Sequence, residues 1–288
     1  MEPENHMDNQ VQNPLIKHFR QPALWLKLPS DGNYWQPGSL NKSPSGEIAV
    51  YPMTTREEII IRTPDALMNG EGVVKVIQNC CPDITDAWNM PSIDVDAVLI
   101  AIRIASYGND MDVDSNCPSC KVENNHAVDL NYVLANVRKP DYTQQVEHPD
   151  IRVKLKPQRY FDVNRRNKII FEEQRILSTI TDESMEEAEK VAKYNQYLSN
   201  LVDLNMSLLA TSTEHIETTD GLVVDDPEFI LEYYNNAPGQ MIRDIQKQLE
   251  RFNQDSSLPK VQVQCEECQH VYEVALEFDY SNFFATGS

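Results

Sequence analysis

Two short cysteine pairs, far apart in the chain, constrain the fold of this 288-residue sequence more than any other feature. The first pair is Cys117 and Cys120, and the second is Cys265 and Cys268. A Cys-x-x-Cys turn can place two thiolates along one edge of a tetrahedron, so two such turns complete a four-sulfur shell for a Zn²⁺ ion. If both pairs bind one ion, distant parts of the chain have to lie side by side.

The long separation of the pairs makes the motif less specific for zinc, but it adds little to the free energy needed to close the loop between them. Two pairs that form a zinc site are usually roughly 15 to 20 residues apart, whereas here residues 121–264 intervene. A loop about eightfold longer costs about three times 0.6 kcal/mol more to close, against about 10 to 16 kcal/mol for a structural zinc site. The sequence favours one shared structural zinc ion. Four buried reduced thiols without metal, and a redox switch, remain as alternatives.

The residues that follow each cysteine pair support a shared site. After Cys120 and after Cys268 the chain reads as a turn and then as a strand with alternating apolar and polar residues. Two such units, each feeding a hairpin, describe a zinc ribbon whose halves come from distant parts of the chain. His126 and His270 lie near the pairs and are possible substitute ligands. With four thiolates present, the more economical interpretation is that both histidines are strand residues.

The charge of the chain disfavours several classes of partner. There are 25 basic and 45 acidic residues, which gives 25 − 45 = −20, and such a field repels nucleic acid. No apolar run approaches the roughly 18 residues of a membrane span, and the N-terminus lacks the order of a secretory signal. We therefore expect a soluble cytosolic protein without membrane contacts, whose cysteines are thiols or metal ligands rather than disulfides.

The two cysteine pairs also predict the domain organisation. Residues 1–22 are polar, contain three prolines and read as a flexible N-terminal arm that orders on a partner. Residues 23–157 and 258–288 are expected to form one zinc-anchored body of the α+β class, because both halves of the ribbon have to pair to bury their apolar faces. Residues 158–257 then form a mostly helical insertion whose ends lie close together.

Local signals predict individual elements of the body. Strands are expected at 24–28, 48–53 and 151–157, and an apolar helix or strand at 73–80. Thr54 or Thr55, with Glu57 or Glu58 for the reciprocal contact, has the pattern of a capping box, so a helix is predicted to begin there and to end before Pro64. An apolar stripe predicts a further helix at 94–106.

The insertion is predicted to contain a basic helix, a long apolar helix and two shorter helices. Arg165, Arg166 and Lys168 make the helix that begins near residue 160 basic, as a solvated face or as a dock for an acidic partner. The helix at 184–209 has a stripe of apolar residues that is wide enough for packing within the chain, which is favoured over a seam with a partner; this stripe consists of Tyr194, Tyr197, Leu201, Leu204 and Leu208. Helices are also expected at 229–235 and 239–252. The acidic run at 217–235 reads as solvated surface.

Catalytic motifs are lacking throughout the sequence. There is no phosphate-binding loop, dinucleotide-binding motif, zinc-protease motif or nucleophile elbow, so no catalytic residue, no small-molecule substrate and no enzymatic activity are predicted. The Asp110-x-Asp112-x-Asp114 run fails as a calcium loop, because Ser115 and Lys121 occupy the positions that need Gly and Glu.

Cys80 and Cys81 are a separate case from the two cysteine pairs. Adjacent cysteines cannot chelate one zinc ion as a Cys-x-x-Cys turn does, and these two follow an apolar run. They are predicted to be buried structural thiols that behave as small apolar side chains.

Five motif blocks, at 24–130 and 260–284, resemble the T4-type baseplate hub assembly family of contractile-tailed bacteriophages. The blocks are Leu28-Pro-Ser-x-Gly with Tyr34, Pro52-Met-Thr-Thr-Arg-Glu-Glu, Arg103-x-x-Ser-Tyr-Gly, Cys117-Pro-x-Cys, and the closing Cys-x-x-Cys with Phe-Asp-x-Ser-Asn-Phe-Phe. The resemblance implies a late viral protein without enzymatic activity that helps to build the central hub of the tail baseplate. It implies other hub or wedge proteins as partners, and a location in the host cytoplasm during assembly and then in the virion.

The resemblance carries the two cysteine pairs over as the family's most transferable feature. The chain departs from shorter members in its polar arm and in the size of its helical middle, which leaves open whether it is a permanent subunit or an assembly factor that leaves. The competing hypothesis is a zinc-ribbon protein that binds nucleic acid or acts in transcription. Such a ribbon needs a basic face, yet Lys121 is the only base near pairs that are flanked by acidic and neutral residues.

Overall fold

The computed structural model describes residues 13–63, 70–180, 187–276 and 283–284. The first core is built from β1 (Leu24–Lys27), β2 (Glu47–Val50), α1 (Thr55–Ile61), α3 (Glu71–Cys80), η2 (Ala87–Asn89), α4 (Ser92–Tyr107) and α5 (Leu130–Ala135). Two hairpins consist of β3 (Asp110–Asn116), β4 (Glu123–Asp129), β9 (Val261–Gln264) and β10 (Val271–Val274). The second core is built from β5 (Gln145–Glu147), β6 (Ile151–Leu155), α7 (Glu187–Thr211), β7 (Thr213–Thr218), β8 (Val223–Val224), α8 (Pro227–Asn236) and α9 (Gly239–Asp255). Helix α6 (Tyr160–Ile180) begins at the first core, where Tyr160 is buried.

The mixture of helices and antiparallel sheets agrees with the α+β class expected from the sequence. Among the described residues, no helix combines the length and the apolar character needed to cross a membrane.

The first core surrounds helix α4. Residues 97–102 of this helix are buried on every side, as expected of a helix in the middle of a core. α1 begins where the capping box predicts, because the Glu57 carboxylate accepts the backbone N–H of Thr54 at 2.7 Å. α1 ends at Ile61, ahead of residues 64–69, which lie outside the described residues.

The C-terminal end of the chain returns to this first core. Phe283 and Phe284 are buried in it, although the preceding residues of the Phe-Asp-x-Ser-Asn-Phe-Phe motif lie outside the described residues. The Arg103 guanidinium of α4 donates a hydrogen bond to the Phe283 carbonyl at 3.0 Å and lies 5.4 Å from the centre of the Phe283 ring. Two of the motif blocks noted in the sequence are therefore in direct contact.

The second core packs helices α7, α8 and α9 against a four-stranded antiparallel sheet of order β5-β6-β7-β8. β6 pairs with β7, with Ile151 opposite Thr218, and Val153 and Leu155 are buried in the second core. β5 and β6, which the sequence predicts to be part of the zinc-anchored body, thus share a sheet with β7 and β8, which lie within residues 158–257. The alternation at 151–157 identifies a strand, but it contains no information on which strand pairs with it.

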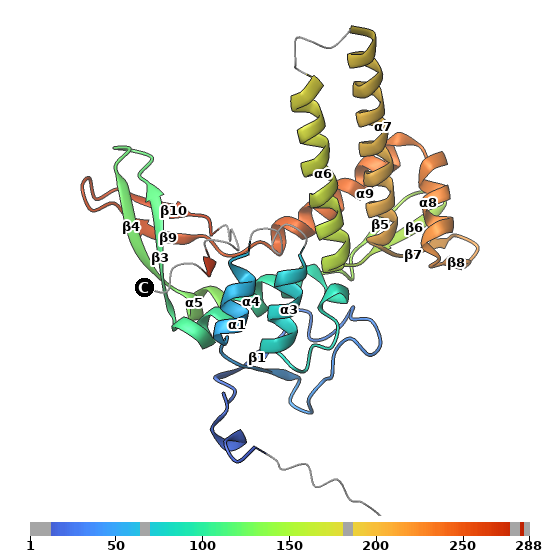
Figure 1. Ribbon diagram of the computed structural model, residues 1–288. Helices are drawn as coiled ribbons and strands as arrows, with labels where there is room; N and C mark the ends of the chain where they lie inside the picture. The colour runs from blue at the N-terminus through green and yellow to red at the C-terminus, as the bar shows by residue number, and fades with distance from the viewer. Residues whose placement is uncertain (1–12, 64–69, 181–186, 277–282, 285–288) are drawn as a thin grey trace, which may run out of the picture.

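The helices α6 and α7 form a hairpin that extends away from both cores (Figure 1). The apolar stripe of α7 changes along this length, since Leu204 and Leu208 are buried whereas Tyr194 is exposed. The predicted packing within the chain is confirmed for the end of α7 nearest the second core and is wrong for the projecting end. Residues 184–186, the predicted start of this helix, lie outside the described residues.

Arg20 fastens the described part of the predicted N-terminal arm to the first core. The Arg20 guanidinium donates to the carbonyls of Pro52 and Asn79 at 2.6 and 2.7 Å, and it forms an ion pair with Glu57 at 3.3 Å. Residues 13–19 extend from this anchor and include the short 3-10 turn η1 (Ile16–His18), while residues 1–12 lie outside the described residues.

Candidate metal centre

The four cysteines that the sequence singles out meet at the tips of the two hairpins. Cys117 and Cys120 lie in the turn between β3 and β4, and Cys265 and Cys268 lie in the turn between β9 and β10. The four sulfur atoms all lie within 4.8 Å of one another. Figure 1 shows the β3–β4 and β9–β10 hairpins side by side, so the topology brings residues from distant parts of the chain to one site.

The sulfur spacing fits a tetrahedral metal site. The Sγ atoms of Cys117 and Cys268 are 3.6 Å apart, and those of Cys120 and Cys265 are 3.5 Å apart. Zinc–sulfur bonds of about 2.3 Å in tetrahedral geometry separate neighbouring sulfurs by about 3.8 Å. A disulfide needs about 2.05 Å. The four residues are free thiols at a spacing that is suitable for one metal ion.

The two cysteine turns have the same backbone geometry. The carbonyl of Cys117 accepts the N–H of Lys121 at 2.9 Å, and the carbonyl of Cys265 accepts the N–H of Gln269 at 3.0 Å. Lys121 and Gln269 both adopt a left-handed conformation, with φ of 63° and 60°. This matched geometry turns both cysteines of each pair toward the centre of the site. The sequence signal for it is the Cys-x-x-Cys spacing alone, since neither left-handed residue is a glycine.

Backbone groups favour thiolate formation at one of the cysteines. The N–H of Cys268 lowers the pKa of the Cys265 thiol to about 6, and the N–H of Glu267 acts in the same direction. At Cys120 the N–H of Val122 lowers the pKa, but burial and the neighbouring thiols together raise it to about 12. Four thiols this close cannot all ionise without a cation between them. The four thiols could therefore hold a metal ion that prefers sulfur ligands.

Side chains around the cysteines join the two hairpins. The Tyr272 hydroxyl lies 2.8 Å from Ser115 Oγ and 3.2 Å from His126 Nε2, so it links β10 to both strands of the other hairpin. The Asn124 side-chain carbonyl accepts the N–H of Glu266 at 3.0 Å. Sequence reasoning missed Ser115, Asn124 and Tyr272, because nothing in the local pattern shows contacts across so many residues.

The two histidines near the cysteines are not part of the cluster. Among the described residues the cluster of possible metal ligands contains only the four cysteines. His126 lies on β4 and faces the Tyr272 hydroxyl, and the His270 ring stacks on Tyr272 with 6.3 Å between ring centres. His126 is thus the strand residue that the sequence indicated, while His270 directly precedes β10.

Burial closes the site on one side only. Cys117 and Cys265 are completely buried, Cys120 is half-buried and Cys268 is exposed. Four sulfurs occupy all positions of a tetrahedral shell, so a bound metal has no open position for a substrate or a water molecule. Closed four-sulfur shells of this kind are typical of structural metal sites.

Cys80 and Cys81 lie elsewhere, in the first core, and both are completely buried as predicted. Burial raises the pKa of Cys80 to about 11 and raises the pKa of Cys81 well above its usual value. Both are therefore neutral thiols at physiological pH and act as small apolar side chains.

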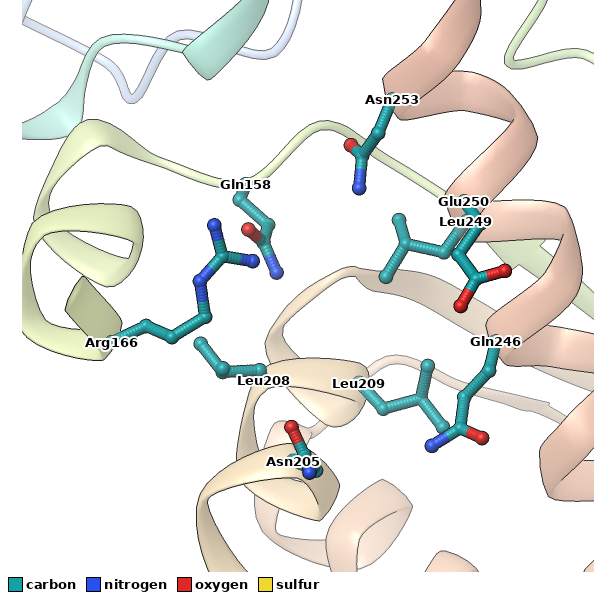
Figure 2. Close-up of a pocket in the computed structure, with 9 residues that line it drawn as sticks. All are labelled: Gln158, Arg166, Asn205, Leu208, Leu209, Gln246, Leu249, Glu250 and Asn253. Carbon is teal, nitrogen blue, oxygen red and sulfur yellow. The ribbon is translucent and has the colours of Figure 1, made fainter. Parts of the chain in front are cut away.

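The basic residues of α6 do not form the single face suggested by the sequence. Arg166 points into a cavity of about 300 Å³ between α6, α7 and α9, where Leu208 and Leu249 form part of the wall (Figure 2). Arg165 and Lys168 line a different cavity, together with Trp88 and Phe161. Arg166 therefore lines one cavity, and the other two basic residues line another.

Comparison with known proteins identifies the family. The sequence profile described as "T4 bacteriophage base plate protein" matches residues 38–285, which is most of the chain. The match spans both hairpins, the second core, all four clustered cysteines and the elements of the first core other than β1. Neither the curated proteins nor the solved structures contain a significant match. The chain belongs to the T4 bacteriophage base plate protein family.

Proposed function

We propose that this protein is a non-enzymatic component of the baseplate hub that works by binding other tail proteins and is stabilised by one structural zinc ion. The observation that carries the proposal is the meeting of two distant hairpins at a four-thiol cluster, in a chain of the base plate family. Tail proteins of the hub or wedge are the proposed partners. The host cytoplasm during assembly, and then the virion tail, is the proposed location.

The proposed zinc ligands are Cys117, Cys120, Cys265 and Cys268. Their spacing, their matched turns and the backbone N–H groups directed at Cys265 support this assignment. When bound, the ion would tie β3–β4 to β9–β10 and so hold residues from both parts of the chain in one body. Binding free energy at such a site adds to folding free energy, because the unfolded chain has no preformed site.

A two-unit organisation is part of the proposal. The zinc-anchored body contains the first core and both hairpins, and the second unit contains the sheet β5-β6-β7-β8 with α6 to α9. We move the boundary from residue 157 to near residue 140, so that β5 and β6 stay with the strand they pair with. This arrangement leaves the α6–α7 hairpin and the N-terminal arm as projections that can contact neighbours.

Co-expression with the other tail proteins tests the functional proposal. Purification of the tagged full chain, followed by chemical cross-linking and mass spectrometry, is expected to identify hub or wedge subunits as direct neighbours. A chain that co-purifies with no tail protein, or that turns over a small substrate, would overturn the proposal. Purified tails then distinguish a permanent subunit, which remains in the particle, from an assembly factor, which does not.

A further inference from the structure

The edge of the second core carries an exposed apolar pocket. It has a volume of about 340 Å³, and residues of β6, β7, β8 and α8 line it, among them Ile151, Ile216, Val224 and Tyr233. At its mouth Phe229 of α8 is 63% exposed and Tyr233 of the same helix is 38% exposed. Large apolar side chains that gather at a surface in this way mark binding sites for apolar groups.

Most of the residues that line this pocket come from an acidic segment of the chain that forms its rim, and one acid, Glu232, lines the pocket itself. Residues 217–235, which include β8 and α8, contain six acidic residues and no lysine or arginine. Glu217 is paired with Arg152 at 2.9 Å. The other five acids form no ion pair with any described residue: Asp220, Asp225, Asp226, Glu228 and Glu232. An occupant of the pocket therefore needs apolar side chains that are accompanied by positive charge.

The N-terminal arm has this chemistry. In the short stretch that precedes the Arg20 anchor, Leu15 is 60% exposed, Phe19 is 54% exposed and Ile16 is also exposed. Lys17 lies between them and has no ion pair among the described residues. Residues 9–30 contain no acidic residue, which is unusual in a chain of net charge −20. The arm is thus a basic, apolar segment that the described part of the molecule leaves exposed.

Other segments of the chain do not fit the pocket. The stretches outside the described residues, 1–12, 64–69, 181–186, 277–282 and 285–288, contain no lysine or arginine, and most of them contain acids that the rim would repel. The arm of the same molecule leaves the first core on the side of β1, away from β8 and α8, which lie at the far edge of the second core (Figure 1). A second molecule can supply the arm without this restriction.

We infer that residues 13–19 of one copy dock in the β8–α8 pocket of a second copy, with Leu15, Ile16 and Phe19 in the apolar pocket and Lys17 against the acidic rim. Arm and pocket are different surfaces, so the contact is head-to-tail, and each bound copy still offers a free arm or a free pocket. Repetition of this contact gives a closed ring or an open chain of subunits. Such self-association needs neither zinc nor another tail protein.

Sedimentation velocity of the full chain over a series of micromolar concentrations tests this contact. The wild type is expected to form dimers and larger species as the concentration rises. An arm variant, Leu15→Asp with Phe19→Asp, and a pocket variant, Phe229→Asp with Tyr233→Asp, are each expected to remain monomeric. All four positions are exposed, so folding is retained. Tyr132→Asp, at an equally exposed site on α5, is the matched control and is expected to associate like the wild type.

Mixing the two variants is the decisive measurement. The arm variant keeps an intact pocket and the pocket variant keeps an intact arm, so an equimolar mixture is expected to form one-to-one dimers and nothing larger. Lys17→Glu alone is expected to weaken association by about tenfold, equivalent to about 1.4 kcal/mol. A wild type that stays monomeric, or a mixture that stays monomeric, overturns the inference. Association of either variant by itself at the wild-type level also overturns it. Co-purification with hub proteins tests the proposed function independently. If the chain does not self-associate in sedimentation, the proposed function is unaffected.

Discussion

A single buried residue, Asp94, joins the Leu28-Pro-Ser-x-Gly motif to helix α4. Asp94 of α4 is completely buried, and its carboxylate accepts hydrogen bonds from the Ser30 backbone N–H and hydroxyl at 2.8 and 2.5 Å and from the Trp35 indole at 2.9 Å. The Ser30 hydroxyl also accepts the N–H of Gly32. Gly32 has a φ of +68°, a left-handed conformation that favours glycine. The Leu28-Pro-Ser-x-Gly motif is therefore a turn fixed to α4 by one buried carboxylate.

Asp94 makes stability depend on pH in a defined direction. Burial raises its pKa from 3.8 to about 6, against the hydrogen bonds that lower it. Its stabilising contribution is complete below pH 3.8 and is lost as the pH rises through about 6. Asp94→Asn is expected to lower the free energy of unfolding at pH 5 by about 1 to 3 kcal/mol, because the amide N–H₂ cannot accept the Trp35 N–H. The difference from the wild type should narrow as the pH rises to 8.

Urea unfolding of both proteins across this pH range measures the difference directly. Asp203→Asn, at an exposed position on α7, is the matched control and is expected to follow the wild type at every pH. If the free energies of unfolding of wild type and Asp94→Asn differ by the same amount from pH 4 to pH 8, Asp94 is not the source of the pH dependence.

The proposed zinc ligands give a second test at the residue scale. One zinc ion per chain is expected by elemental analysis and native mass spectrometry. Cys117→Ser and Cys265→Ser are each expected to lose most of the metal and to unfold at a lower temperature, because each removes a ligand from the same shell. Glu267→Gln, an exposed residue inside the second turn that is not a ligand, should keep both metal and stability. Full metal retention in both serine variants would rule out the shared site.

At the scale of elements, hairpins and sheets acquire their partners from distant segments. β3–β4 and β9–β10 are each regular two-stranded hairpins, which are marginal in isolation. They become stable by contact with one another through Tyr272, Asn124 and the cysteine cluster. The same holds in the second core, where β6 pairs with β7 although α6 and α7 separate the two strands in the sequence.

Removal of the Tyr272 hydroxyl tests the hydrogen bonds between the hairpins. Tyr272→Phe keeps the ring but loses the contacts with Ser115 and His126, so the free energy of unfolding is expected to fall by about 1 kcal/mol while the zinc content stays at one per chain. Tyr132→Phe, on an exposed ring of α5, is the matched control and should change neither quantity. Equal stability of Tyr272→Phe and wild type in chemical denaturation would show that these contacts contribute nothing net.

At the scale of the whole molecule, the C-terminal residues complete the first core. Phe284 is completely buried beside Phe283, and the two rings meet edge to face with 4.9 Å between their centres. Arg103 fixes this end by its hydrogen bond to the Phe283 carbonyl. The C-terminal part of the chain therefore contacts the N-terminal part at two places, the cysteine cluster and this pair of phenylalanines. In the sequence, the residues of the second core lie between the two cysteine pairs.

Truncation of Phe284 measures how much this closure contributes. Phe284→Ala is expected to destabilise the protein by about 3 to 5 kcal/mol, because it leaves a cavity in the first core. Phe171→Ala, on the exposed surface of α6, should change stability by less than about 0.5 kcal/mol. Thermal or chemical unfolding that gives similar values for the two variants would mean that the C-terminal end does not contribute to the core.

The sequence by itself determined features that depend on neighbouring residues. The capping box at Thr54, the buried helix near residues 94–106 and the two Cys-x-x-Cys turns could all be read from local spacing, because caps, helical periodicity and metal knuckles are short-range devices. The pairing of β6 with β7, the different cavities that Arg166 and Lys168 line, and the burial of Leu204 and Leu208 but not of Tyr194 in the α7 stripe became evident only in the folded chain. Pairing and burial depend on which distant surface is available, and a local pattern contains no such information.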